Sequence, residues 1–271
     1  MTEQLMAKEP VCVTPGLRWD GFGLAKGWCP GCHNGIIHRI VCEVIDELGI
    51  EDRAIGIIGI GCCCSITRGT NVDTIWALHG RCLPVGTGIK RVNPDAIVFM
   101  IEGDGGLGAI GAAHFINTML RGERLTAIYV NNSGYGRTGG QVAPTTLSGM
   151  RSTTTPYGRD PETTGFLFKG AEIAAIMEGT AYSARVSVHT PANYQRAKKA
   201  IKAAFQKQID GIGFGLAEVL CNCPTNWQMT PVQTLKFMEE KVIPEFPLGE
   251  FKNVDSIDRS FDAELTKVGK I

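Results

Sequence analysis

The sequence predicts an α/β protein built on a parallel sheet with helices on both faces. Three observations lead to this prediction. Short apolar runs rich in β-branched residues recur along the chain, helical patterns alternate with them, and glycines mark the ends of both. The 271 residues are enough to bury a large core, and the 34 glycines indicate many tight turns and close backbone approaches.

The predicted fold is clearest between residues 96 and 140. The apolar runs 96–101 and 125–130 have the composition of buried strands, and residues 107–120 between them follow a helical pattern. Strand, helix and strand at this spacing predict a βαβ unit. Asp104 and Asn132 then lie just past the carboxyl ends of two parallel strands, where open α/β sheets bind their ligands.

The chemistry at this expected edge is that of a magnesium-bound diphosphate. Asp104 offers a carboxylate oxygen and Asn132 a carbonyl oxygen, and Mg²⁺ prefers such oxygens together with phosphate and water. The helix that follows adds free N–H groups at its first turn. Three glycines would let a phosphate approach the backbone: Gly103, Gly105 and Gly106. The alternative is an ordinary strand-to-helix turn with a surface aspartate. That alternative does not explain the second motif at Asn131–Asn132.

Composition excludes some functions. Lys plus Arg and Asp plus Glu number 27 each, so charge gives no reason to expect nucleic acid or an anionic membrane as a partner. No apolar run approaches the roughly 18 residues of a spanning helix. The first ten residues lack the basic-then-apolar order of a signal peptide, so we expect a cytoplasmic protein.

The ten cysteines point to metal ligation, because disulfides are rare in the cytoplasm. Residues 29–32 form a C-x-x-C pair at the start of an expected helix that ends at Gly49; the N-terminus of a helix favours thiolates. For His33 and His38 a surface or supporting role is expected rather than ligation. Cys42 and Cys82 are expected to be packed side chains.

The remaining expected elements follow the same reasoning. Residues 54–61 read as a strand that feeds a glycine-rich turn, and 68–71 and 78–90 read as a loop and a second glycine-rich segment. The polar stretch 141–159 is too long for a passive connector. The later elements are a helix over 171–179, a strand over 184–188, a helix over 192–208, a strand over 214–220, and a final helix with an extended tail.

Four thiolates from three segments suit either Zn²⁺ or a [4Fe-4S] cluster. The candidates are Cys29, Cys32, one of Cys62, Cys63 and Cys64, and either Cys221 or Cys223. One C-x-x-C pair joined by two distant single cysteines, beside a predicted cofactor site, favours iron–sulfur over a zinc site made of two close pairs.

The sequence also resembles a known family. The residues on which this resemblance rests are His79–Arg81, Gly103–Gly105, His114, Asn131–Asn132, Tyr135–Gly136 and Gly140–Thr146. They resemble the thiamine-diphosphate-binding β-type subunit of 2-oxoacid:ferredoxin oxidoreductases. Within that family, the sequence is most similar to the 2-oxoisovalerate branch. The resemblance covers residues 19–235, which implies one domain that binds thiamine diphosphate, Mg²⁺ and an iron–sulfur cluster. Residues 1–18 are then an N-terminal arm, and 236–271 a C-terminal helix and tail.

The resemblance assigns roles to individual residues. It implies that Asp104, Asn132 and the Gly134 carbonyl bind Mg²⁺. The cofactor-contacting residues that it implies are Ile60, Gly61, Cys62, Cys63, His79, Gly80, Gly105 and Gly106. The cluster ligands that it implies are Cys29, Cys32, Cys62 and Cys223. Many members have Asp in place of Gly106. Asn222 replaces the proline that usually precedes the last cysteine, which leaves Cys221 as an alternative ligand.

The resemblance implies oxidative decarboxylation of a 2-oxoacid to an acyl-CoA, with electrons passed through the cluster to ferredoxin. Arg137 falls at a position that contacts the 2-oxoacid, and Gly139 replaces a lysine that some members use toward coenzyme A. The substrate is expected to be 2-oxoisovalerate or, if Arg137 pairs with a second carboxylate, 2-oxoglutarate.

The expected partners are an α-type pyrimidine-binding subunit and γ- and ferredoxin-like δ-type subunits, without which the chain is expected to be inactive. Two alternatives stay open from the residues. One is a clusterless thiamine-diphosphate decarboxylase or synthase subunit. The other is a zinc-stabilised scaffold subunit without catalytic activity.

Overall fold

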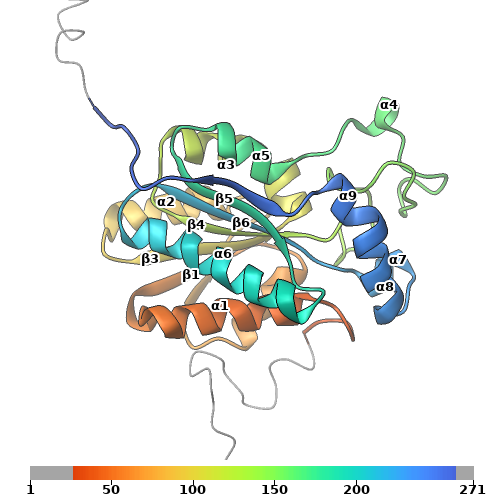
Figure 1. The fold of residues 1–271 in the computed structure, drawn as a ribbon, viewed down its shortest axis with the longest axis horizontal. Coiled ribbons are helices and arrows are strands. Elements are labelled where there is room, and N and C mark those ends of the chain that lie inside the picture. The colour runs from red at the N-terminus through yellow and green to blue at the C-terminus, as the bar shows by residue number, and fades with distance from the viewer. Residues whose placement is uncertain (1–26, 261–271) are drawn as a thin grey trace, which may run out of the picture.

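The computed structural model describes residues 27–260 of the chain, apart from the side chain of Arg68. The described residues form a seven-stranded sheet in the order β2-β1-β3-β4-β6-β5-β7 (Figure 1). Every neighbouring pair is parallel except β5 and β7, which are antiparallel. The strands are β1 (Ala54–Ile58), β2 (Asp73–Trp76), β3 (Ile97–Gly103), β4 (Thr126–Asn131), β5 (Thr180–Ser187), β6 (Phe214–Leu220) and β7 (Gly249–Asn253).

Helices cover both faces of the sheet, as predicted (Figure 1). On one face α1 (Asn34–Leu48) and α6 (Pro191–Ile209) pack against each other and bury one apolar cluster. On the other face α2 (Cys82–Val92), α3 (Ala112–Leu120) and α5 (Gly170–Ile176) enclose a second cluster. A sheet buried on both faces explains why β3, β4 and β6 are apolar almost throughout rather than alternating.

Short helical segments complete the fold. The short 3₁₀ and π elements are η1 (Glu51–Arg53), η2 (Cys62–Arg68), η3 (Gly106–Ile110) and η4 (Met238–Val242). The short α-helices are α4 (Pro161–Thr164), α7 (Pro224–Trp227), α8 (Pro231–Phe237) and α9 (Ile243–Glu245). Segments near α7 to α9 bury a third apolar cluster that includes Leu220, Trp227 and Phe246.

Several elements form where local sequence predicted them. Gly49 adopts φ 61° and ψ 38° and ends α1 as a left-handed cap. Helix α6 begins after Thr190, whose hydroxyl accepts the Asn193 N–H, with Pro191 at the first helical position. Strand β6 has the bounds that its apolar run predicted.

Other predictions were wrong in detail. Most of helix α2 lies in the glycine-rich segment 78–90, for which no helix was predicted. The helix packs closely against Val98 and Ile57 because Gly86 has no side chain. Tertiary packing of this kind outweighs the low helix propensity of glycine. Strand β2 was missed because its exposed pattern at the sheet edge carries little apolar signal. The predicted helix over 107–120 is a π-turn followed by α3, interrupted at Gly111.

The C-x-x-C pair does not open α1 as predicted. Helix α1 begins at Asn34, and Cys29 to Cys32 form a preceding turn in which the Cys32 N–H donates to the Cys29 carbonyl at 3.1 Å. The expected arm over residues 1–18 lies outside the described residues. The expected boundary between residues 235 and 236 falls inside α8, and β7 beyond it joins the same sheet.

Candidate functional site

The residues predicted to bind a cofactor gather in one pocket at the carboxyl edge of the parallel strands. Strands β1, β3 and β4 end at Ile58, Gly103 and Asn131, and the turns that follow them line the pocket. The predicted residues in its lining are Ile60, Gly61, Cys62, Cys63, His79, Asp104, Gly105, Gly106, Asn132, Gly134 and Arg137. Gly80 lies directly behind it, where its N–H donates to Glu102. Segments from three strand ends and one helix start therefore surround one space.

Asp104 lies at the base of this pocket and is 2% exposed. Its Oδ1 accepts the Gly105 N–H at 2.9 Å, and its Oδ2 accepts the Gly134 N–H at 3.1 Å and the Thr145 hydroxyl. Burial raises the pKa of Asp104 to about 6, although these three hydrogen bonds favour the charged form. A buried carboxylate aimed into a pocket suits a cation that would compensate its charge.

The turn after β4 places Asn132 and Gly134 beside Asp104. Ser133, between them, has φ 59°, a left-handed conformation that is unusual for a residue other than glycine. Two contacts hold the turn: the Ser133 N–H donates to Asn131 Oδ1 at 3.3 Å, and the Ser133 carbonyl accepts the Thr146 hydroxyl at 2.8 Å. Strain held in this way is typical of functional sites.

The glycine at 105 is required by its neighbour Tyr135. A Cβ at Gly105 would lie 2.1 Å from the Tyr135 ring, and the Tyr135 hydroxyl donates to the Gly105 carbonyl at 3.3 Å. His79 faces the same ring edge-on, and its Nδ1 is buried without a hydrogen-bond partner in the described residues. An unpartnered polar atom in a pocket indicates a ligand contact.

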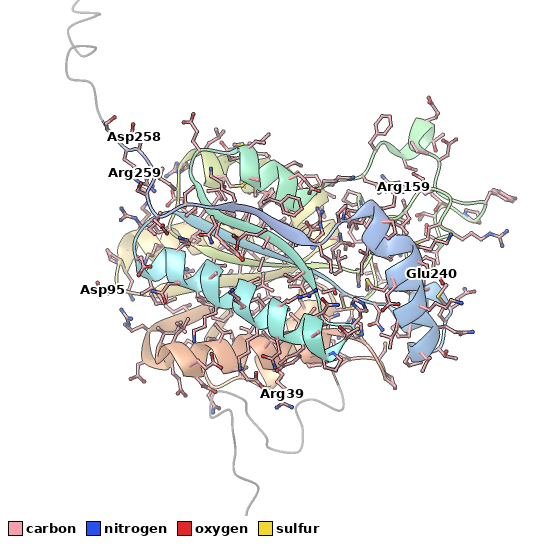
Figure 2. The ribbon with its side chains drawn as sticks, in the orientation of Figure 1. Arg39, Asp95, Arg159, Glu240, Asp258 and Arg259 are labelled. Atoms are coloured by element: carbon pink, nitrogen blue, oxygen red, sulfur yellow. The ribbon has the colours of Figure 1, made fainter. Side chains whose placement is uncertain are left out.

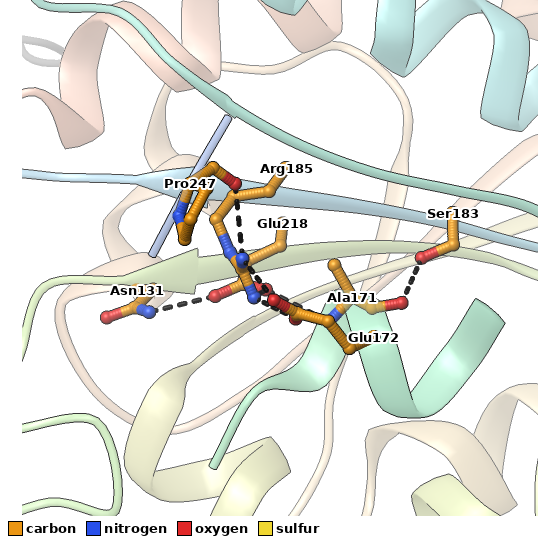
Figure 3. Close-up of polar contacts among 7 residues, drawn as sticks. All are labelled: Asn131, Ala171, Glu172, Ser183, Arg185, Glu218 and Pro247. Atoms are coloured by element: carbon orange, nitrogen blue, oxygen red, sulfur yellow. Dashed lines mark hydrogen bonds and ion pairs between the residues drawn. The ribbon is translucent and has the colours of Figure 1, made fainter. Parts of the chain in front are cut away.

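A buried charge network supports the end of β4 (Figure 3). Asn131 Nδ2 donates to Glu218 Oε1 at 2.8 Å, and Glu218 Oε2 lies 3.0 Å from Arg185. Arg185 is fully buried, also pairs with Glu172, and donates to the Pro247 carbonyl at 3.2 Å. The network therefore joins strands β4, β6 and β5 to α5 and the segment before β7.

The predicted cluster cysteines come from the three expected segments. Cys29 is exposed, Cys32 and Cys62 are half-buried, and Cys223 is buried. Burial raises the pKa of Cys62 to about 12, and the charges of Cys223, Cys32 and Cys29 add to the same shift. The four sulfurs therefore lie within electrostatic reach of one another. In residues 27–260, however, no three His, Cys, Asp or Glu side chains form a closed set that could hold a metal ion.

The side chain of Asn222 connects the segment that carries Cys223 to the C-x-x-C turn by hydrogen bonds. Its Oδ1 accepts the His33 N–H at 2.9 Å, and its Nδ2 donates to the Gly31 carbonyl at 3.0 Å and to Thr234 at 2.7 Å. The side chain is fully buried. This anchoring of the C-x-x-C turn was not predicted, because in the sequence Asn222 stands out only as a replacement for proline.

The pKa of Cys32 falls to about 6, mainly because Cys221 hydrogen-bonds to it and partly through Asn34, whose Nδ2 lies 3.3 Å from its sulfur. The neighbouring thiol is therefore the largest influence on this thiolate, and the start of α1 at Asn34 adds to it. Of the surface or supporting role expected for His33 and His38, the surface role was wrong, since both are buried at 4% and 2% exposure. Thr145 and Tyr135 were missed as contacts of the site.

The fold and this site define the class of the protein. Residues 59–212 match the family described as "Thiamine pyrophosphate enzyme, C-terminal TPP binding domain". Because this match covers more than half of the chain, the chain belongs to the thiamine-diphosphate enzymes. Relatives narrow the class further: the chain is a member of the thiamine-diphosphate-binding subunits of 2-oxoacid:ferredoxin oxidoreductases.

The relatives differ in the substrate that they are named for. The ketoisovalerate oxidoreductase subunit VorA of Methanothermobacter thermautotrophicus is 40% identical over 89% of this chain and 49% of the relative. This chain thus spans about half of that relative's length. The 2-oxoglutarate synthase subunit KorB of Archaeoglobus fulgidus is 38% identical over 79% of this chain and 75% of the relative.

A solved structure has the same fold. The 2-oxoglutarate:ferredoxin oxidoreductase from Magnetococcus marinus, with 2-oxoglutarate, coenzyme A and succinyl-CoA bound, aligns with a TM-score of 0.72 at 26% identity. The alignment covers 89% of this chain and 85% of that one. In the described part of the present chain, no helix is both long and apolar enough to cross a bilayer.

Proposed function

We propose that this chain is the β-type subunit of a coenzyme A-acylating 2-oxoacid:ferredoxin oxidoreductase, active only with partner subunits. The observation that carries the proposal is the meeting of Asp104, Asn132 and bare glycine backbone in one pocket at the carboxyl edge of the sheet. This chemistry suits a magnesium-bound diphosphate rather than a neutral ligand. The family match points to the same cofactor.

Thiamine diphosphate, when bound, supplies the chemistry by which a 2-oxoacid loses CO₂. The chain's own residues would hold it in place. Asp104, the Asn132 side chain and the Gly134 carbonyl would bind the Mg²⁺. The diphosphate would rest on the backbone of Gly105 and Gly106 at the start of the helical turn. The missing Cβ atoms of these glycines leave room for Tyr135 and Glu102 behind that backbone. Tyr135, packed on Gly105, would exclude water from one side of this contact.

We further propose that Cys29, Cys32, Cys62 and Cys223 hold a [4Fe-4S] cluster, which would supply electron transfer. Support comes from the electrostatic influence of Cys29 and Cys32 on both Cys62 and Cys223. The Asn222 contacts that hold the C-x-x-C turn next to Cys223 give further support. Cys62 would lie between the two groups, because it also lines the cofactor pocket.

The substrate proposed is a 2-oxoacid of the 2-oxoisovalerate or 2-oxoglutarate type. Arg137 is exposed at the mouth of the pocket, where it can reach a substrate carboxylate. A branched-chain 2-oxoacid has a single carboxylate, whereas 2-oxoglutarate has a second one for Arg137 to bind. Of the two relatives named above, one is named for ketoisovalerate and the other for 2-oxoglutarate.

The pocket needs a partner to close it. Large apolar side chains are exposed on the segments around it: Ile60 at 43%, Ile75 at 42%, Trp76 at 56%, Leu78 at 79% and Ile110 at 48%. An apolar patch at the rim of a site is typical of a subunit interface. We assign it to an α-type pyrimidine-binding subunit. The γ-type and ferredoxin-like δ-type subunits, and ferredoxin as acceptor, complete the proposed assembly.

The test is composition and activity of the anaerobically purified complex. We expect one thiamine diphosphate and about four iron and four sulfide per copy of this chain, once a Cys29→Ser variant has corrected for clusters on partners. Asp104→Asn should lose the thiamine diphosphate, because it removes the charge that compensates Mg²⁺, and keep the iron. Zinc in place of iron would refute the electron-transfer role, and absence of thiamine diphosphate would refute the whole proposal.

The substrate is tested with 2-oxoisovalerate and 2-oxoglutarate, each with coenzyme A and ferredoxin. Arg137→Gln should raise KM for 2-oxoglutarate alone if Arg137 binds a second carboxylate. An equal effect on both substrates would place Arg137 at the carboxylate that they share.

A further inference from the structure

A buried carboxyl group that the proposed chemistry does not use lies beneath the cofactor pocket. Glu102 is the residue before the last in β3 and is 1% exposed. Burial raises its pKa to about 7. A carboxyl group inside a protein destabilises the fold unless its contacts compensate for lost hydration, so these contacts need an explanation.

The contacts of Glu102 are with the backbone of three separate segments and with the thiol of Cys82, which donates a hydrogen bond to the carboxyl group. The Gly80 N–H donates to Glu102 Oε1 at 2.8 Å. A Cβ at Gly59 would lie 2.7 Å from Glu102 Cγ, and one at Gly106 would lie 2.6 Å from both Cγ and Oε1. The side chain therefore fills the space between three glycines that come from the end of β1, the turn before α2 and the turn after β3.

Each of these glycines is adjacent to predicted cofactor contacts. Gly59 leads into Ile60 to Cys63, Gly80 follows His79, and Gly106 follows Gly105. The contacted segments all line the pocket, whereas Glu102 is absent from its lining. One side chain thus touches, from behind, three of the backbone segments that form the pocket.

We propose that Glu102 is a positioning residue that holds these three turns at the spacing needed by the diphosphate cofactor. This inference rests on the proposed binding of thiamine diphosphate. Two properties of the side chain matter: its length, which brings Oε1 to the Gly80 N–H, and its acceptor oxygen. Its negative charge is not required, because the Gly80 N–H and the Cys82 thiol need only an acceptor oxygen, which a neutral side chain of the same length also offers.

The test uses two substitutions that separate shape from charge. Glu102→Gln keeps the length and an acceptor oxygen, whereas Glu102→Asp keeps the charge and is one methylene shorter. We expect the affinity of the complex for thiamine diphosphate, measured by calorimetry with saturating Mg²⁺, to stay within about threefold for Glu102→Gln and to fall about tenfold or more for Glu102→Asp. The reverse order, or no effect of Glu102→Asp, would overturn the proposal.

Glu123 provides a matched control for general loss of stability. It is 4% exposed and pairs with Arg91 and Arg121 near the amino end of β4, at the opposite edge of the sheet. Glu123→Asp should lower the Tm yet leave the affinity for thiamine diphosphate unchanged. If Glu123→Asp weakens the affinity as much as Glu102→Asp does, the effect is one of stability and the proposal fails. Wild-type complex that binds no thiamine diphosphate would instead refute the proposed function itself.

Discussion

Asn131 Nδ2 donates a hydrogen bond to Glu218 Oε1 at 2.8 Å, across two adjacent parallel strands and wholly within the protein (Figure 3). The other atom of the same amide, Oδ1, accepts the N–H of Ser133. Asn131 therefore connects a buried charge network to the left-handed turn that carries Asn132 and Gly134.

This relationship predicts the effect of Asn131→Ala. Loss of both hydrogen bonds leaves the Ser133 turn unsupported and should reduce thermodynamic stability by about 1–3 kcal/mol, because buried polar partners lose their bonds. Binding of Mg²⁺ and thiamine diphosphate should weaken about tenfold, as for other residues that orient metal ligands. Denaturant unfolding and calorimetric titration measure the two effects.

Ser133→Gly should rescue part of this loss in the double variant. Glycine adopts φ near 59° without the strain that a Cβ imposes, about 1 kcal/mol, so the turn depends less on Asn131. Thr146→Val, which removes the hydroxyl bond to the Ser133 carbonyl, offers a second test of the same turn. If Ser133→Gly lowers cofactor affinity in the Asn131→Ala background, strain at Ser133 is not what Asn131 holds.

The free energy of unfolding should depend on pH because His38 is buried. It is 2% exposed in α1, and burial lowers its pKa from 6.5 to about 4. Since the unfolded chain binds the proton more tightly, the stability associated with neutral His38 is complete above pH 6.5. It is lost as the pH falls toward 4, by on the order of 3 kcal/mol.

Urea unfolding between pH 4 and 7 measures this dependence, with His38→Gln for comparison. Subtracting the variant's curve from that of the wild type should isolate the contribution of the imidazole. Equal slopes for the two proteins in this range would show that His38 does not titrate as proposed.

The two neighbouring cysteines Cys221 and Cys223 should differ when each is replaced by serine. We expect Cys223→Ser to lose most of the iron and Cys221→Ser to retain it, because Cys221 is fully buried and its nearest sulfur contact is Cys32. Iron and sulfide analysis gives the answer directly. Cys82→Ser, within the opposite apolar cluster, is the control for loss of a buried thiol. Iron lost from Cys221→Ser but not from Cys223→Ser would exchange their roles.

The exposed apolar side chains of Trp76 and Leu78 are predicted to lie in the interface with the partner subunit. Replacing either with Asp should weaken assembly with the α-type subunit by tenfold or more, about 1.4 kcal/mol. The isolated chain should keep its stability, because these side chains are 56% and 79% exposed. Analytical ultracentrifugation of the mixed subunits measures the change. Val92→Asp, at 85% exposure and the far end of α2, should assemble normally; equal loss in all three variants would contradict the assignment.

Sequence patterns alone predicted the parallel strands β1, β3, β4, β5 and β6 and the edge at which a cofactor was expected, but not β2 or β7. Apolar runs of β3, β4 and β6 carry their own signal because both of their faces are buried, and turn residues such as Asp104 and Asn132 follow them directly in the chain. Local patterns of this kind need no knowledge of distant segments. Local patterns did not predict β2, because most of this edge strand is exposed and its residues do not follow an apolar pattern. They did not predict α2 either, because a glycine makes a close contact with the sheet.

The way in which separate segments support the site depends on contacts between residues that are far apart in the chain. The clamp between Asn222 and the Gly31–His33 turn joins residues about 190 positions apart in the chain, and the bond between Asn131 and Glu218 joins residues 87 apart. Burial of Glu102 between three glycines, and of Arg185 between two carboxylates, likewise depends on the packing of distant strands and turns. Hydrogen bonds and burial depend on distance in space, and a periodic pattern along one chain records only which side of an element faces inward.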